Sequence, residues 1–149
     1  MAQGVAPQWA YDKCKNLFRC WKWTEKNLDE MVISGRNAKN GPYAIRVRDQ
    51  VEADEELKNL SANDIKNKEM ITETLEERLI HELKFFKETG KHLDIENITL
   101  CSASRCADGG GVPSARWDKR WDECNERFLV GWHYPGGAGN GLRSRAAVS

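Results

Sequence analysis

Apolar residues in the first two-thirds of the chain recur three, four or seven positions apart, which is the spacing of an amphipathic helix. This pattern predicts one helix from Trp9 to about Val32 and another from Pro42 to Leu57, where the apolar edge is narrow. A third, more regular stripe predicts a longer helix ending at Thr89-Gly90, because glycine readily takes the backbone angles that close a helix. This stripe consists of Ile71, Leu75, Leu79, Leu83 and Phe86.

A further helix start is predicted at Ser61. Asp64 follows three residues later, and such a pair forms a capping box in which each side chain accepts a hydrogen bond from the other residue's backbone N–H. The short polar segment up to Lys68 is therefore expected to begin with an ordered cap.

Beyond Gly90 the pattern changes to short runs rich in β-branched and aromatic residues, separated by glycine turns at 109–111 and 136–141. These runs predict strands rather than helices. The predicted strands start at Ile98 and cover Val112 to Trp117, Arg127 to Tyr134 and Leu142 to Val148.

Together these elements predict an α+β fold in a single domain of residues 1–149. An N-terminal helical bundle of three or four helices, from about residue 8 to 90, is followed by a small antiparallel β-sheet at the C-terminus, from about residue 95 to 149. A chain of 149 residues is long enough to bury one core.

Composition narrows the setting in which the chain is expected to work. No apolar run approaches the roughly 20 residues that cross a bilayer, and Met1 to Gln8 lacks the pattern of a secretion signal. The five cysteines are an odd number, which favours reduced thiols. We therefore expect a cytoplasmic protein without membrane association.

Charge is unevenly distributed although the net charge is zero. Residues 49–96 carry seven Lys or Arg against fourteen Asp or Glu, whereas the segments before and after are basic. The expectation is a solvated acidic face, and mimicry of nucleic acid is the alternative.

Arginine and large aromatic residues concentrate in the last third of the chain, where rings offer apolar contact area and guanidinium groups stack on rings or pair with carboxylates and phosphates. Arg143 and Arg145 would share one face of a terminal strand. In the alternative interpretation, the tryptophans form a small core and the arginines pair with nearby carboxylates such as Asp118. The candidate binding residues are Arg116, Trp117, Arg120, Trp121, Trp132, Tyr134, Arg143 and Arg145.

The same segment carries an ordered set of motifs. They are Ser104-Arg105, Ala107-Asp108-Gly-Gly, Val112-Pro113, Trp117, Phe128-Leu-Val-Gly-Trp132, Pro135-Gly136 and Leu142 to Ser149. This set resembles the carboxyl-terminal end of uncharacterised small proteins of gut-bacterial phages and prophages, which implies a mobile-DNA context and no particular activity. A weaker likeness is to C-type-lectin-like variable proteins diversified by retroelements, which implies a ligand-facing surface at the carboxyl end. That fold usually needs more residues than this segment has.

No catalytic spacing is present, and we expect neither an enzyme nor a cofactor. The position that would complete a zinc-protease motif after His81 is Phe85. A zinc site is the alternative to inert thiols, but the cysteine spacings are not those of zinc knuckles. Its ligands would be Cys101, Cys106, Cys124 and His133.

These observations predict a non-enzymatic phage or prophage accessory protein that binds a protein partner, with a host-defence component as one candidate. The first alternative is a nucleic-acid-associated module that uses an arginine and tryptophan face. The second is a lectin-like ligand-binding protein. The sequence fixes neither the partner nor the oligomeric state.

Overall fold

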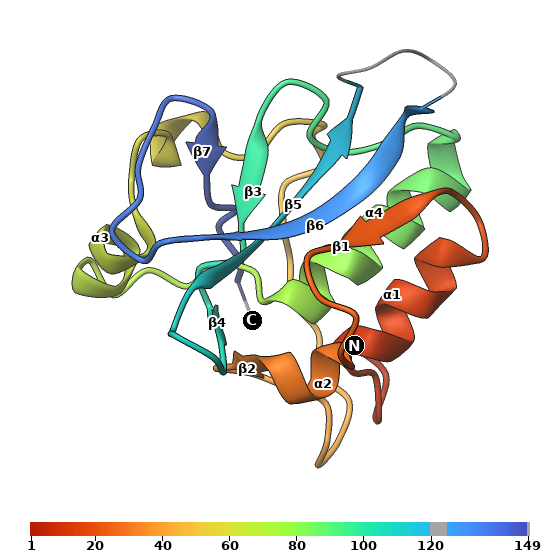
Figure 1. Cartoon of the computed structure of the whole chain (residues 1–149). Helices are drawn as coiled ribbons and strands as arrows, with labels where there is room; N and C mark the ends of the chain where they lie inside the picture. The colour runs from red at the N-terminus through yellow and green to blue at the C-terminus, as the bar shows by residue number, and fades with distance from the viewer. Residues whose placement is uncertain (120–124, 149) are drawn as a thin grey trace.

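A five-stranded mixed sheet lies at the centre of the computed structural model, which describes residues 1–119 and 125–148 (Figure 1). The strand order is β1-β6-β5-β3-β7, with both edge strands parallel to their neighbours and the inner pairs antiparallel. A two-stranded antiparallel sheet of β2 and β4 lies beside it. The strands are β1 (Cys20–Lys22), β2 (Val32–Ser34), β3 (Ile98–Leu100), β4 (Ser104–Cys106), β5 (Val112–Asp118), β6 (Arg127–His133) and β7 (Leu142–Arg143).

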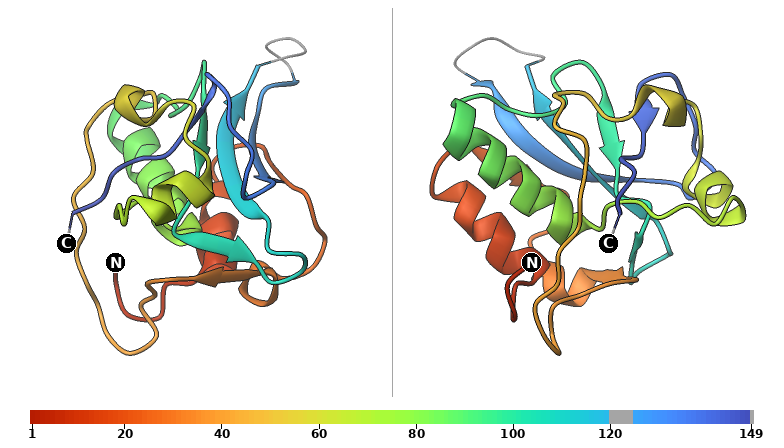
Figure 2. Two further views of the ribbon diagram at one scale, coloured as in Figure 1. Left: turned by 90° about the vertical axis from the view of Figure 1, so that its left-hand side faces the viewer. Right: turned by 180° about the vertical axis from the view of Figure 1, so that it is seen from behind.

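Two longer helices, α1 (Pro7–Lys15) and α4 (Leu75–Thr89), lie side by side against one face of this sheet (Figure 2, right). The remaining helical segments are short: α2 (Leu28–Met31), α3 (Ala62–Asn67) and the 3-10 turn η1 (Glu55–Leu57). Within the described ranges, no helix combines the length and the apolar character that crossing a bilayer requires.

The main core lies between the two longer helices and the sheet. Leu75 and Leu79 of α4 are fully buried against Phe128 and Val130 of β6 and Trp117 of β5. Phe128 and Trp117 are direct cross-strand neighbours, so both point to the helix side of the sheet. A second, smaller cluster combines Ala62 of α3 with Leu100, Val112 and Leu142.

The helix ends predicted from side-chain chemistry are confirmed. Ser61 and Asp64 form the expected capping box of α3. Thr74 and Glu77 form a second capping box at the start of α4, and Gly90 closes that helix with a φ of 71°. Local hydrogen bonding determines these features, so few residues suffice to predict them.

The predicted N-terminal helical bundle is wrong, since strands and loops replace much of it. The first predicted helix ends at Lys15, and Cys20–Lys22 forms an edge strand parallel to β6. Trp23 N donates to Val130 O at 3.1 Å, and Phe128 N donates to Arg19 O at 2.8 Å. The open edge of β6 supplies backbone partners that helical spacing cannot reveal, and tertiary pairing outweighs local propensity.

The second predicted helix is also wrong. From Tyr43 to Arg48 the residues alternate between half-buried and exposed, which is the period of an extended chain. Arg46 forms an antiparallel bridge with Val148, and only Glu55–Leu57 is helical, as a 3-10 turn. The run Ile45-Arg46-Val47-Arg48 alternates apolar and charged side chains, so the correct signal was present beside the helical spacing.

The predicted small antiparallel C-terminal sheet is wrong in its pairing. β5 and β6 form where expected, but the sheet is mixed and takes one of its strands, β1, from the N-terminal third. The predicted strand from Leu142 to Val148 ends at Arg143. Ala146 and Val148 form isolated bridges with Thr72 and Arg46. The carboxyl end therefore runs along distant segments instead of continuing beside its neighbour.

The acidic middle of the chain is not a solvated face, because several of its carboxylates are buried.

We call the group formed by Arg78, Glu82, Asp94, Thr99 and Arg145 the Asp94 cluster. Asp94 accepts hydrogen bonds from Arg78 Nη2 at 2.9 Å, Arg145 Nη2 at 2.8 Å and the Thr99 hydroxyl. Glu82 pairs with Arg78 at 2.8 Å. Mutual pairing allows these charges to be buried.

The four described cysteines are free thiols, namely Cys14, Cys20, Cys101 and Cys106. Burial, with a smaller contribution from Glu82, raises the pKa of Cys14 to about 12. Burial also raises the pKa of Cys101 well above its ordinary value. Since the thiolate is the nucleophile, both thiols are expected to be unreactive in the folded protein.

Iodoacetamide at pH 8 is therefore expected to alkylate Cys14 and Cys101 about 100-fold more slowly in the native protein than in guanidinium chloride. Peptide mass spectrometry after timed quenching gives the two rates. Equal rates in both conditions would contradict the buried placement of these side chains.

Candidate functional site

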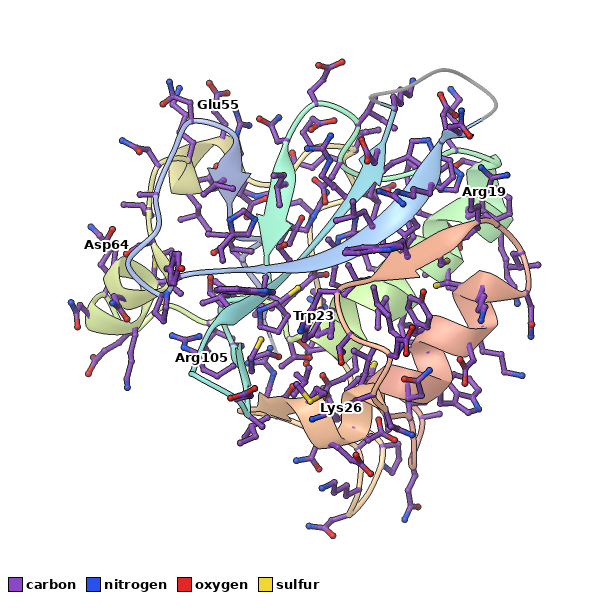
Figure 3. All side chains as sticks on the ribbon, viewed as in Figure 1. Arg19, Trp23, Lys26, Glu55, Asp64 and Arg105 are labelled. Carbon is purple, nitrogen blue, oxygen red and sulfur yellow. The ribbon has the colours of Figure 1, made fainter. Side chains whose placement is uncertain are left out.

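A pocket lined by aromatic side chains lies where the end of β6 meets the loop between β4 and β5. Its volume is about 320 Å³. Trp23 lies between β6 and α2 in the view of Figure 3. We call this site the aromatic pocket; it is lined by Trp23, Met31, Cys106, Asp108, Gly109, Gly111, Trp132 and Tyr134.

Two exposed rings form one wall of the aromatic pocket. Trp132 is 44% exposed and Tyr134 is 75% exposed, and their rings meet edge to face with centroids 5.2 Å apart. The Trp132 ring rests on Gly111, where a Cβ atom would stand 2.9 Å from its Cε3. Glycine at this position therefore allows the indole to lie against the backbone of β5.

The backbone that carries Tyr134 is fixed by hydrogen bonds on both sides of a turn. Gly137 N donates to Tyr134 O at 2.8 Å, and Asn63 N of α3 donates to Pro135 O at 3.0 Å. These hydrogen bonds hold the Cα of Tyr134 in place, while its ring projects from the fold. Such a ring can contact a ligand without first ordering a loop.

Asp108 faces the aromatic wall from the β4–β5 loop. The loop is closed by Cys106 N donating to Gly111 O at 2.6 Å and is tied to α2 by Ala107 N donating to Met31 O at 2.8 Å. Burial and the neighbouring Asp108 carboxylate raise the pKa of Cys106 to about 11. The pocket therefore combines aromatic rings and a neutral thiol with one carboxylate.

Of the eight predicted binding residues, the structure brings Trp132 and Tyr134 together in this pocket. Trp117 is only 6% exposed and stacks on His92 in the core, with ring centroids 3.5 Å apart. Arg120 and Trp121 lie outside the described residues.

The remaining predicted arginines do not line the pocket. Arg116 pairs with Asp118 at 3.2 Å. Arg143 donates to Ala53 O at 3.4 Å, and Arg145 is buried in the Asp94 cluster. The core position of Trp117 and the pairing of Arg116 follow the alternative interpretation of the sequence, in which rings pack and arginines pair with carboxylates.

Sequence reasoning missed Trp23, Met31, Asp108 and Gly111 as parts of a site. Trp23 and Met31 come from the N-terminal third, and no local pattern connects them with β6. Asp108 and Gly111 belong to a motif that was interpreted as a turn. An exposed ring beside a glycine turn was the available signal, but it did not identify the opposite wall.

The proposed zinc ligands are not collected by the described part of the fold. Cys101 is fully buried and Cys106 lines the aromatic pocket, while Cys124 lies outside the described residues. Within residues 1–119 and 125–148, no three His, Cys, Asp or Glu side chains are grouped closely enough to hold a metal ion.

A second pocket, of about 260 Å³, lies beside the start of α4. Ser34 Oγ donates to Glu76 Oε2 at 2.7 Å and lies 2.7 Å from Ser104 Oγ. Burial is the strongest influence on the pKa of the Glu76 carboxyl group and raises it. Ser104 Oγ also accepts from Leu75 N at 2.9 Å, so the group stabilises the start of α4 and needs no catalytic role.

The aromatic pocket can therefore bind a ligand through ring faces and one carboxylate, on a backbone that is already ordered. Comparison with protein-family models, with curated proteins and with solved structures gives no match to this chain.

Proposed function

We propose that this chain is a non-enzymatic accessory protein of a phage or prophage that binds a protein partner at the aromatic pocket. The exposed Trp132 and Tyr134 pair carries this proposal. Tryptophan and tyrosine are enriched among the few residues that supply most of the binding energy at protein interfaces. The resemblance of the carboxyl-terminal motifs to phage and prophage proteins supports the context, with a host-defence component as the candidate partner.

The placement of the predicted arginines favours a protein partner over nucleic acid. An arginine surface for phosphate contacts would need Arg143 and Arg145 on the outside. Arg145 is instead 1% exposed, and Arg143 donates to backbone carbonyl groups. The rings of the aromatic pocket stand at the end of a sheet, where a protruding side chain of another protein can enter.

Site-specific photo-crosslinking in the host bacterium tests this function. Benzoylphenylalanine in place of the highly exposed Tyr134 is expected to capture one defined protein, since this side chain stands at the pocket mouth. The matched control places the same group at Trp9, which is 46% exposed and comes from α1. Trp132→Ala is expected to weaken the captured complex at least tenfold, as measured with the purified partner.

Two outcomes would contradict the proposal. The first is an identical set of crosslinks from positions 134 and 9. The second is a partner whose affinity is unchanged by Trp132→Ala and Tyr134→Ala, after circular dichroism has shown both variants to be folded. Capture of a glycan-bearing molecule through its sugar would point to the lectin-like alternative.

A further inference from the structure

We infer that the aromatic pocket receives an arginine side chain of the partner, with the guanidinium group stacked on Trp132 and paired with Asp108. This inference rests on the function proposed above and identifies the chemistry that the pocket recognises.

Among the described residues, the two other exposed large rings, Trp9 and Trp21, already have a cation from the chain itself. Lys13 Nζ lies 5.2 Å from the centroid of the Trp9 ring, and the Arg127 guanidinium carbon lies 5.3 Å from that of Trp21. A cation over an aromatic face is attracted by the negative potential of the ring. Within residues 1–119 and 125–148, no such cation covers Trp132 or Tyr134. Trp132 is 44% exposed and Tyr134 is 75% exposed, so the accessible part of each ring can meet a cation from outside.

The charge of the pocket points to the same ligand. Its lining contains the Asp108 carboxylate and no lysine, arginine or histidine. Asp108 forms no ion pair with any described side chain. Asp108 is exposed, so an incoming cation can pair with a carboxylate that no described side chain already occupies, whereas an incoming carboxylate or phosphate would be repelled.

Arginine fits this lining better than lysine. Its planar guanidinium group stacks on an indole and can donate two parallel hydrogen bonds to one carboxylate, whereas an ammonium group is a strongly hydrated point charge. Met31 and Trp23 offer apolar surface for the three methylene groups of the side chain. The ordered backbone of Tyr134 and of the Asp108 loop keeps both walls in place before binding.

Titration of the full-length protein with blocked tripeptides tests the inference. The probes are acetyl-Gly-Xaa-Gly-amide with arginine, lysine or citrulline at Xaa, where citrulline is the neutral isostere of arginine. Indole N–H shifts in the NMR spectrum report binding, with the Trp132 signal assigned from Trp132→Phe. The arginine peptide is expected to bind about tenfold more tightly than the citrulline peptide.

Asp108→Asn should reduce that preference to the part that stacking on Trp132 supplies, without changing citrulline binding. Asp49→Asn is the matched control, since Asp49 is also an exposed carboxylate of a loop but does not line the pocket. Equal binding of arginine and citrulline, equal binding of arginine and lysine, or an arginine preference that Asp108→Asn leaves unchanged would each overturn the inference.

The two proposals fail in distinguishable ways. If Trp132 and Tyr134 are needed for partner capture but the arginine peptide shows no preference, the proposed function stands and the arginine assignment is wrong. If the peptide binds as expected but position 134 captures no defined protein, the pocket chemistry stands and the proposed protein-binding function is wrong.

Discussion

Asp94→Ala is expected to lower the free energy of unfolding by about 3–5 kcal/mol or more, which is the largest effect we foresee for a single substitution. Asp94 is fully buried and neutralises Arg78 and Arg145, both of which are also buried. It also accepts a hydrogen bond from Ala53 N at 3.0 Å. Without the carboxylate, two guanidinium groups would share the single remaining acid of their cluster, Glu82.

Backbone conformation adds to this cost. Asp94 has a φ of 54°, a left-handed conformation that alanine adopts less readily than aspartate or asparagine, by roughly 1 kcal/mol. Asp94→Asn keeps the conformation and removes the charge, so the difference between the two variants separates strain from electrostatics. Chemical denaturation followed by tryptophan fluorescence gives the three free energies. Stability of Asp94→Ala close to that of the parent would contradict the described network.

Arg145→Ala is expected to destabilise the protein by about 3–5 kcal/mol, although the sequence marked Arg145 as a binding residue. Its side chain is 2% exposed, and its guanidinium group bonds to Asp94 at 2.8 Å and donates to Val51 O at 2.6 Å and Gln50 O at 3.1 Å. Its removal would leave those acceptors unsatisfied in the interior. For a chain of this size such a loss lowers the melting temperature by roughly 10 °C.

Arg143→Ala supplies the matched control, since Arg143 lies two residues earlier and is half-exposed. Its side chain donates to two carbonyl groups at 3.4 and 3.5 Å, which are long and therefore weak hydrogen bonds. We expect Arg143→Ala to change the free energy of unfolding by about 0.5 kcal/mol or less. Differential scanning calorimetry of the pair decides the point. Equal melting temperatures would mean that Arg145 acts at the surface.

Features that depend on neighbouring residues could be predicted from the sequence. The capping box at Ser61, the closure of α4 at Gly90 and the strands β5 and β6 depend on hydrogen bonds or patterns within a few positions. Pairing between distant segments could not be predicted. Cys20–Lys22 is a strand because β6 provides a free edge, and that edge comes from residues more than a hundred positions later.

Burial of charge was the other feature that the sequence concealed. Leucines mark the apolar stripe of the predicted helix, so the sequence assigned the acids between them to the solvent side. These acids are Glu73, Glu76, Glu77 and Glu82. All four are buried, because Arg36, Arg78, His81 and Ser34 reach them from other segments or from the next turn. Hydrophobic periodicity finds apolar faces but cannot identify polar faces whose partners are remote.

One wall of the candidate site could be predicted from the sequence, and the opposite wall could not. Trp132 and Tyr134 are adjacent to a strand end, and their size alone marks them as contact residues. The opposite wall combines a loop carboxylate with Trp23 and Met31. Trp23 approaches through the parallel pairing of β1, and Met31 is held beside the loop by the hydrogen bond that Ala107 N donates to Met31 O. Because these contacts between distant segments were not predicted, the opposite wall of the pocket could not be predicted either.

The parallel pairing of β1 with β6 also affects how the protein can fold during translation. β1 gains its neighbour only after a strand more than a hundred positions later has been made, and Arg78 and Asp94 wait likewise for Arg145. Until β6 and Arg145 have been made, a nascent chain would therefore expose an unpaired β1 and an incomplete Asp94 cluster. Such long-range closure slows folding and leaves the emerging polypeptide dependent on protection by chaperones.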